Sequence, residues 1–164
     1  MSNAQRLNQD SGNHEYYTPS EIIGAAREVM GRITLDPASS AQANKTVRAD
    51  TFYSDNGLDR AWFGRVWMNH PFSRKNNPLW INRLHNAYCQ GEIEEGLCIT
   101  YAATSEAWFQ PLLLRRQCFL TPRTNYLLPN GTVKRGVTKG SVVTYFGPKQ
   151  SLFSSVFRHF GVVK

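Results

Sequence analysis

Apolar residues recur at helical spacing near the start of the chain. The pattern predicts a helix from Pro19 to Met30, with Thr18 as its N-cap and Gly31 just past its end. Glu21 follows Thr18 by three residues, which is the position whose side chain in a capping box accepts a hydrogen bond from the N-cap backbone N–H. One face of this helix is apolar and should be buried: Ile22, Ile23, Ala26, Val29 and Met30.

Short apolar runs after this helix predict strands that alternate with further helices. Helices between strands imply crossover connections, so the sequence predicts an α/β fold with a mostly parallel sheet. Residues 126–133, around Asn130-Gly131, predict an antiparallel hairpin with a tight primed turn that closes the sheet. Strand signals lie at 33–35, 47–53, 66–68, 96–101, 118–120, 141–146 and 161–163, and helix signals at 78–90, 104–114 and 151–160.

A polar, rigid turn follows the strand at 66–68. Asn69 is the first polar residue after the apolar run. Pro71 fixes its own φ and moves the residue before it toward extended backbone, so His70 presents its carbonyl at a defined angle. We expect Phe72 to be an exposed or half-exposed ring at the mouth of the sheet, where ligands of open α/β folds bind.

Length and composition indicate one soluble domain. No apolar run in the 164 residues is long enough to span a bilayer, and no signal-peptide pattern is present. We expect a single domain at 16–164, preceded by an Asn-, Gln- and Ser-rich segment at 1–15 that is disordered or loosely attached. The cysteines lack the spacing of a disulfide framework or a zinc site and predict reduced thiols, no metal and a cytosolic protein: Cys89, Cys98 and Cys118.

Charge is distributed unevenly along the chain. The net charge is +7, and all 12 acidic residues lie at or before Glu106. Residues 107–164 carry nine Lys and Arg without an opposing carboxylate. A segment of one sign indicates a polyanionic partner, and the alternative is a solvated basic face that binds nothing.

The segment Asn69-His70-Pro71-Phe72 resembles the Asn-Pro-Pro-Tyr/Phe motif of S-adenosylmethionine-dependent amino-methyltransferases, with His70 in place of the first proline. The resemblance implies that Asn69 and the backbone carbonyl of His70 accept hydrogen bonds from the target amino group. It also implies that Pro71 restricts the turn and that Phe72 stacks on a flipped base. Any residue supplies a carbonyl, so His70 can keep this role.

Two further segments resemble the cofactor site of the same enzymes. The first, similar to a segment that packs on the cofactor, is Tyr16-Tyr17-Thr18-Pro19; the second, similar to an Asp-Pro motif, is Asp36-Pro37-Ala38-Ser39. In that motif the carboxylate accepts hydrogen bonds from the methionine amino group. Small residues replace the usual glycines at 39–41, and Asp50 stands where a second carboxylate would meet the ribose hydroxyls.

The run Leu-Asp-Pro-Ala-Ser, followed by Ala43-Asn44, most resembles phage-type, Dam-like DNA N6-adenine methyltransferases. The resemblance implies a compact Rossmann-like fold, S-adenosylmethionine as cofactor, and methylation of adenine N6 in double-stranded DNA in the cytoplasm of a bacterial host. The basic residues of 115–140 would then carry most of the duplex contact: Arg115, Arg116, Arg123, Lys134, Arg135 and Lys139.

Two other functions fit parts of the pattern. A protein glutamine N5-methyltransferase uses a similar motif on an amide, although a basic segment free of carboxylates argues for DNA. A catalytically silent nucleic-acid-binding module of the same fold would account for His70 and for the missing glycines. Binding of S-adenosylmethionine would separate that module from an enzyme.

Overall fold

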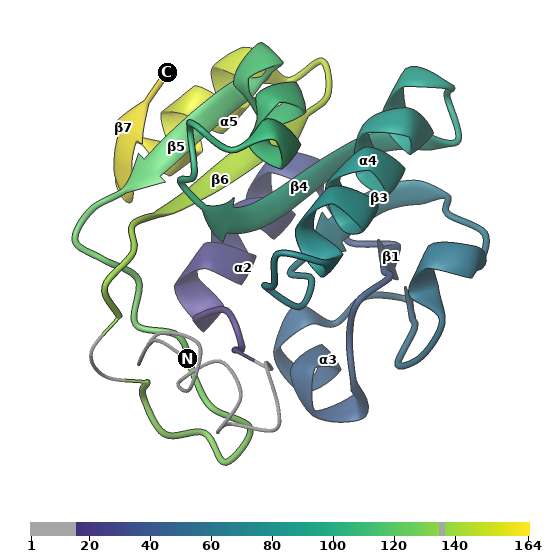
Figure 1. The fold of residues 1–164 in the computed structure, drawn as a ribbon, viewed down its shortest axis with the longest axis horizontal. Coiled ribbons are helices and arrows are strands. Elements are labelled where there is room, and N and C mark those ends of the chain that lie inside the picture. Colours follow the sequence, from purple (N-terminus) through teal and green to yellow (C-terminus); the bar gives the residue numbers. More distant parts are fainter. Residues whose placement is uncertain (1–15, 135–136) are drawn as a thin grey trace.

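The computed structural model describes residues 16–134 and 137–164. These residues form a seven-stranded sheet with helices on both of its faces (Figure 1). The segment at 1–15, predicted to be disordered, and Arg135 lie outside the described residues. In chain order the elements are α2 (Ser20–Met30), β1 (Leu35–Asp36), α3 (Ala41–Val47), β2 (Thr51–Phe52), the 3-10 helix η1 (Gly57–Asp59), β3 (Gly64–Met68), α4 (Asn76–Cys89), β4 (Ile93–Tyr101), the 3-10 helix η2 (Ala107–Leu114), β5 (Arg116–Leu120), β6 (Ser141–Phe146), α5 (Gln150–Phe157) and β7 (Gly161–Val163).

The strand order is β2-β1-β3-β4-β6-β5-β7. Neighbouring strands from β2 to β4 pair in parallel, and every pair from β4 to β7 is antiparallel. Strands β1 to β5 therefore run in one direction, while β6 and β7 run in the other. The predicted α/β class is confirmed, but the prediction of a mostly parallel sheet was too simple, because β6 lies between β4 and β5.

We call the edge of the sheet at which β1 to β5 end the carboxyl edge, and the opposite one the amino edge. From β1 the chain passes through α3 to β2, which lies on one side of β1 in the sheet, and then continues to β3 on the other side of β1. The order of strands thus reverses between β1 and β3. In open α/β sheets such a switch point, at the carboxyl edge, is where ligands bind.

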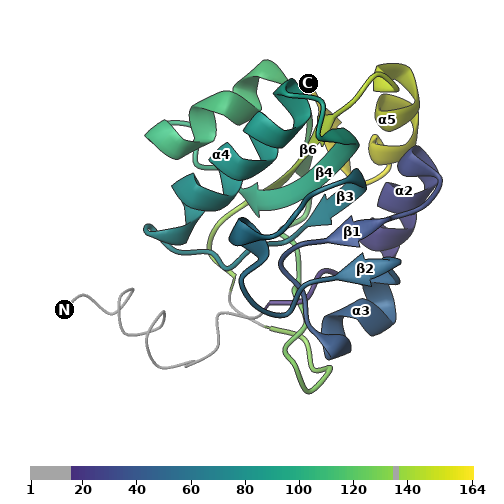
Figure 2. The ribbon, with the colours of Figure 1, turned by 90° about the vertical axis from the view of Figure 1, so that its right-hand side faces the viewer.

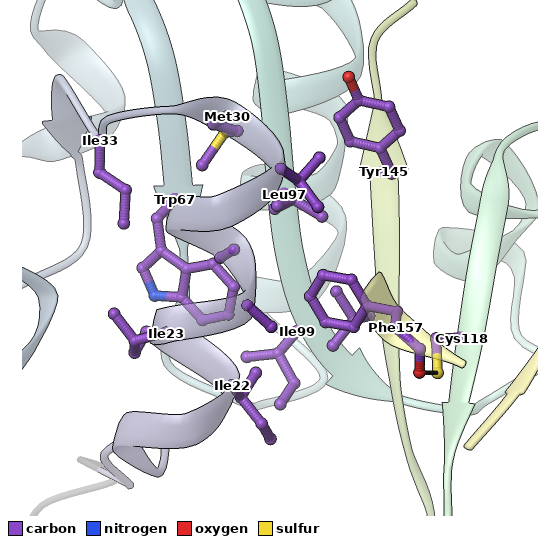
Figure 3. Packing of buried hydrophobic residues seen from close by; sticks show 14 of the residues in the cluster. Ile22, Ile23, Met30, Ile33, Trp67, Leu97, Ile99, Cys118, Tyr145 and Phe157 are labelled. Carbon is purple, nitrogen blue, oxygen red and sulfur yellow. Dashed lines mark hydrogen bonds between the residues drawn. The ribbon is translucent and has the colours of Figure 1, made fainter. Parts of the chain in front are cut away.

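Two apolar cores cover the two faces of the sheet. Figure 2 shows α4 on one face and α2 and α5 on the other. Side chains of a strand alternate between faces, so Trp67 packs under α2, whereas its neighbours Val66 and Met68 pack toward α4. In Figure 3, Ile22 and Ile23 of α2 lie against Trp67 and the residues of β4. The apolar face predicted for the first helix is therefore its buried face.

The predicted capping box is wrong, because Thr18 is used elsewhere. Helix α2 begins at Ser20, with Pro19 as N-cap and no side-chain cap, and the Pro19 carbonyl accepts from the backbone N–H groups of Ile22 and Ile23. The Thr18 hydroxyl instead accepts a hydrogen bond from Asn69. A residue whose sequence position predicts a local helix cap thus binds a segment distant in the sequence instead.

The hairpin predicted at 126–133 forms, but as a loop outside the main sheet. Leu127 pairs with Val133 and also with Tyr17 as isolated antiparallel bridges. Its turn has the Leu128 carbonyl accepting from Gly131 N–H at 2.8 Å, and Gly131 alone in the turn has positive φ, at 84°. A primed turn needs positive φ at its first central residue (type II′) or at both (type I′). Neither central residue here, Pro129 or Asn130, has it, so the predicted turn type is wrong. The antiparallel part of the sheet is built by β5, β6 and β7 instead.

Helix α3 was missed from sequence. Ser40 caps it, accepting from Ala43 N–H at 3.0 Å, and the Asn44 side chain exchanges hydrogen bonds with the backbone of Ala49. These polar contacts compensate for a helix with little apolar surface. The strand predicted at 47–53 is correspondingly reduced to Thr51–Phe52.

No helix within the described ranges is both long and apolar enough to cross a membrane.

Candidate active site

A pocket of about 230 Å³ lies at the carboxyl edge, at the switch point between β1 and β3. Four segments meet around it: the residues before α2, the turn after β1 with α3, the loop after β2, and the turn after β3. The residues predicted from sequence that line it are Tyr16, Tyr17, Thr18, Asp36, Pro37, Ala38, Ser39, Asn69, His70, Pro71 and Phe72.

Asn69 is held in one orientation by its amide nitrogen. Nδ2 donates to the backbone carbonyl of Tyr16 at 2.7 Å and to Thr18 Oγ1 at 3.0 Å. A carbonyl oxygen can only accept, so the atom facing Tyr16 must be the NH₂ group. Asn69 Oδ1 has no hydrogen-bond partner among the described residues. The half-buried side chain therefore offers a fixed, free acceptor in the pocket.

His70 has a buried imidazole that sequence analysis did not anticipate. Its side chain is 2% exposed, stacks on Trp80 and meets the edge of Phe72. Nε2 lies 2.8 Å from Asn77 Oδ1, so it carries the proton and Nδ1 keeps the lone pair. Burial lowers the pKa of His70 to about 4, although the bond to Asn77 raises it. The ring is neutral, and the buried Nδ1 has no hydrogen-bond partner in the part of the chain that the structure describes.

Phe72 is not exposed as predicted. Its ring is 8% exposed and contacts Tyr101, with centroids 4.7 Å apart, and Tyr126 at 6.1 Å. Tyr126 is itself fixed, because its hydroxyl lies 2.7 Å from Ser141 Oγ and the backbone of the next residue pairs with Tyr17. The loop after β5 thus covers the ring that an exposed turn would have left open.

Asp36 is a carboxyl group almost without exposure, at 2%. Burial raises its pKa to about 7, while hydrogen bonds from the Ala38 backbone and the Ser39 side chain act in the opposite direction. Ala38 N–H donates to Oδ1 at 3.2 Å. These two hydrogen bonds do not offset the effect of burial, so a cationic or donor group of a ligand would stabilise the charged form of Asp36.

Gly57 makes a close approach that fixes the pocket wall. A Cβ at this position would lie 1.8 Å from the Pro37 carbonyl oxygen and 3.0 Å from the Trp80 ring. The Gly57 carbonyl also accepts from Trp62 Nε1 at 2.8 Å. The loop after β2 is therefore locked against the Asp-Pro turn, with no space for a larger residue.

Two predicted cofactor residues are not among those that line the pocket. Pro19 caps α2, and Asp50 lies before β2, at the amino edge, where it forms an exposed ion pair with Arg32. The end of β2 faces the pocket instead. The sequence predicted the end of this strand to within one residue but placed Asp50, and not residues 53–56, in the cofactor site. The acidic residue of this loop is Asp55, paired with Arg60 at 2.7 Å.

The predicted basic cluster is separated into two groups. Arg123, Lys134 and Lys139 lie in the loop after β5, at the carboxyl edge (Figure 1). Arg115 and Arg116 stand at the start of β5, at the amino edge. The Arg115 guanidinium packs over the rings of Tyr88 and Phe146, and Arg116 faces Gln150. Only the first group is near the pocket.

Within residues 16–134 and 137–164, no group of three or more His, Cys, Asp or Glu side chains could hold a metal ion. The pocket thus offers hydrogen-bond acceptors and aromatic surface.

Comparison with protein families assigns the chain to a family. Residues 5–157 match the family model described as DNA N-6-adenine-methyltransferase (Dam). The chain belongs to the Dam family. The match spans both the Asp-Pro turn and the 69–72 motif, and so covers the pocket described above. No curated protein and no solved structure matches the chain.

Membership of the Dam family gives the class of reaction and of substrate. The family is one of DNA methyltransferases acting on adenine N6, and methyltransferases generally use S-adenosylmethionine as the methyl donor. The family also favours DNA over a protein glutamine as the substrate. In this Dam-family chain the histidine at position 70 is integrated into the fold through Asn77 and Trp80 rather than merely replacing a proline.

Proposed function

We propose that the protein transfers a methyl group from S-adenosylmethionine to N6 of adenine in double-stranded DNA. The observation that carries this proposal is the free Oδ1 of Asn69, which the carbonyl of Tyr16 and the hydroxyl of Thr18 hold in position through Nδ2. The Leu-Asp-Pro-Ala-Ser run supports a phage-type enzyme that works in the cytoplasm of a bacterial host.

The chain would contribute to catalysis by accepting hydrogen bonds from the adenine amino group and by orienting this group toward the methyl donor. Asn69 Oδ1 and the His70 carbonyl would each accept one N–H of the adenine amino group, which draws the nitrogen lone pair out of conjugation with the base. S-adenosylmethionine supplies the electrophilic methyl group when bound. Because both acceptors belong to one turn fixed by Pro71, the amine would be held in a single orientation, and positioning accounts for most of the rate.

The pocket fits the chemistry of that cofactor. Asp36 is buried with incomplete compensation and would bind the methionine ammonium group. Small side chains at Ala38, Ser39 and Ala43 keep the wall open beside it. Asp55, at the end of β2, lines the same pocket and replaces Asp50 in our proposal as the carboxylate for the ribose hydroxyls.

Entry of an adenine requires a local rearrangement. The pocket volume of about 230 Å³ is below the roughly 300 Å³ at which drug-sized ligand pockets begin. Tyr101 and Tyr126 cover the Phe72 ring on which the base would stack. We therefore propose that the rings of Tyr101 and Tyr126 shift away from Phe72 when the flipped base enters.

Tritiated methyl transfer from S-adenosylmethionine to duplex DNA, followed by nucleoside analysis, tests the proposed reaction. Label in N6-methyladenine is the expected result. Calorimetric titration with S-adenosylmethionine distinguishes the alternatives, because a catalytically silent DNA-binding module would give DNA binding without cofactor binding. Cofactor binding with label on a protein glutamine, and none on DNA, would overturn the proposal.

A further inference from the structure

Two cations lie just after the 69–72 motif, and their side chains have no partner within residues 16–134 and 137–164. Arg74 and Lys75 are both exposed, in the turn between Phe72 and α4. Among the described residues neither takes part in an ion pair or a hydrogen bond, unlike Arg32, Arg60 and Arg83, which pair with carboxylates. Sequence analysis left them out because it placed the DNA surface in the C-terminal third of the chain.

The turn that carries these cations is anchored at both ends. Ser73 Oγ accepts from Asn76 N–H at 3.0 Å, and the Ser73 carbonyl accepts from Asn77 N–H at 2.9 Å. Asn77 in turn binds the His70 imidazole. Arg74 lies two residues beyond Phe72, so at most about 7 Å of backbone separates their Cα atoms. The backbone of both residues therefore lies a short distance from the position proposed for the adenine.

A second basic group lies on the other side of the motif. Lys139 Nζ stands 5.3 Å from the centre of the Tyr101 ring, which contacts Phe72. Arg123 and Lys134 belong to the same loop after β5. The sequence from 107 to 140 contains no carboxylate, and none occurs between Asn69 and Lys75. The connection after β2 carries Asp55, paired with Arg60, and Asp59, the connection after β4 carries Glu106, and Asp36 lies buried in the pocket.

We propose that Arg74 and Lys75 bind backbone phosphates of duplex DNA beside the target adenine, across the pocket from the loop after β5. This inference rests on the proposed function and extends it, since it gives the duplex two contacts, one on each side of the base that leaves the stack. Paired phosphate contacts would hold the strand while its base rotates into the pocket. Phosphates carry no sequence information, so the contribution is to position and not to base recognition.

The test compares two double variants of the full chain. Arg74→Gln with Lys75→Gln removes the proposed contacts, and Arg116→Gln with Lys164→Gln removes the same charge at the amino edge, where the Gln117 N–H binds the Lys164 carbonyl. Affinity for a duplex is measured by fluorescence anisotropy over a series of salt concentrations. The slope of log affinity against log salt should flatten by about 1–2 units in the first variant only.

Cofactor titration and methyl transfer separate this inference from the proposed function. The Arg74/Lys75 variant should bind S-adenosylmethionine as the wild type does, and its KM for DNA should rise while kcat changes less. Equal slopes in both double variants would overturn the inference, while methylation by the wild type would leave the proposed function standing. A wild type that binds neither duplex nor cofactor would overturn both.

Discussion

The two edges of the sheet treat buried polar groups in opposite ways. At the amino edge, Glu95 is 3% exposed and both of its carboxylate oxygens are used. Oε2 accepts from Tyr145 at 2.6 Å, Oε1 from Lys149 at 2.9 Å, and Arg65 lies at 3.5 Å. Arg65 and Lys149 also donate to the last carbonyls of α2, at Met30 and Val29. This cluster joins α2, β3, β4, β6 and α5.

At the carboxyl edge, comparable groups are left without full compensation. Among the described residues, buried His70 Nδ1 and half-buried Asn69 Oδ1 have no hydrogen-bond partner, and hydrogen bonds from the Ala38 backbone and the Ser39 side chain do not offset the burial of Asp36. Each buried, unpaired polar group costs roughly 1–3 kcal/mol. At the amino edge, Arg115 Nε is also buried without a partner among the described residues, but its guanidinium packs over the rings of Tyr88 and Phe146 and does not line the pocket. The groups at the carboxyl edge line one pocket, so we infer that a ligand completes them.

Asn69→Ala should produce the largest effect on activity. Loss of Oδ1 removes an acceptor for the target amine, so kcat should fall by about 10²–10³, as when one preorganised hydrogen-bond partner of a transition state is deleted. Stability should change by about 1 kcal/mol, because the two Nδ2 bonds are also lost. Methyl-transfer kinetics, urea unfolding and cofactor titration measure these effects; Asn86→Ala, on the exposed face of α4, is the matched control.

Transfer within a few-fold of wild type in Asn69→Ala would show that the free acceptor is not used.

Glu95→Ala should produce the opposite signature at the amino edge. Tyr145 loses its acceptor and two cations lose a buried partner, but both cations are about one third exposed and regain water, so the cost should be about 2–3 kcal/mol. The free energy of unfolding from urea titration measures it. Activity per folded molecule should stay near wild type, and Glu94→Ala, which removes only an exposed pair with Arg65, should cost less than about 1 kcal/mol.

A loss of activity in folded Glu95→Ala would contradict the assignment of Glu95 to stability alone.

The elements were predictable where local pattern and tertiary packing agree. Strands with long apolar runs, such as β6, and the apolar face of α2 follow directly from periodicity. The place of β6 between β4 and β5 does not, because pairing order depends on contacts between distant segments. Helix α3 was missed for a related reason: its stability comes from the Ser40 cap and the Asn44 side chain rather than from an apolar stripe.

The site was predictable where a motif is contiguous. Residues 69–72 and 36–39 do line one pocket, as their positions after strands suggest. Two features could not be read from sequence. Thr18 was predicted to be a helix cap, but its hydroxyl accepts a hydrogen bond from Asn69. Asp50 was predicted to line the pocket, but it lies just before the start of β2 and therefore at the amino edge, where it pairs with Arg32.

Asp36→Ala should weaken S-adenosylmethionine binding by roughly 1.5–3 kcal/mol, the range for a hydrogen bond to a charged group. Isothermal titration calorimetry measures the affinity, and Asp59→Ala, an exposed residue of η1, is the control. Unchanged affinity would remove Asp36 from the cofactor site.

The Asp36 pKa also predicts how stability depends on pH. Burial raises the pKa from 3.8 to about 7, so between these values the folded state binds more protons than the unfolded state. Stability contributed by Asp36 therefore falls as pH rises through this window. The unfolding free energy of Asp36→Asn minus that of wild type should increase from pH 4 to pH 7. A constant difference would contradict the assignment of a buried, poorly compensated carboxyl.

His70→Pro should produce the smallest effect, and it separates the backbone of residue 70 from its side chain. The substitution keeps the carbonyl that would hold the amine, so transfer per folded molecule should stay within about ten-fold of wild type. It removes the imidazole that binds Asn77 and stacks on Trp80, leaving Asn77 Oδ1 unpaired at a cost of about 1–2 kcal/mol in urea unfolding. If transfer instead falls as far as in Asn69→Ala while the variant stays folded, the unpaired Nδ1 takes part in catalysis.

The control is His85→Gln, which removes an imidazole from α4 that makes no contact with the 69–72 motif. His85→Pro is unsuitable as a control, because a proline would break α4.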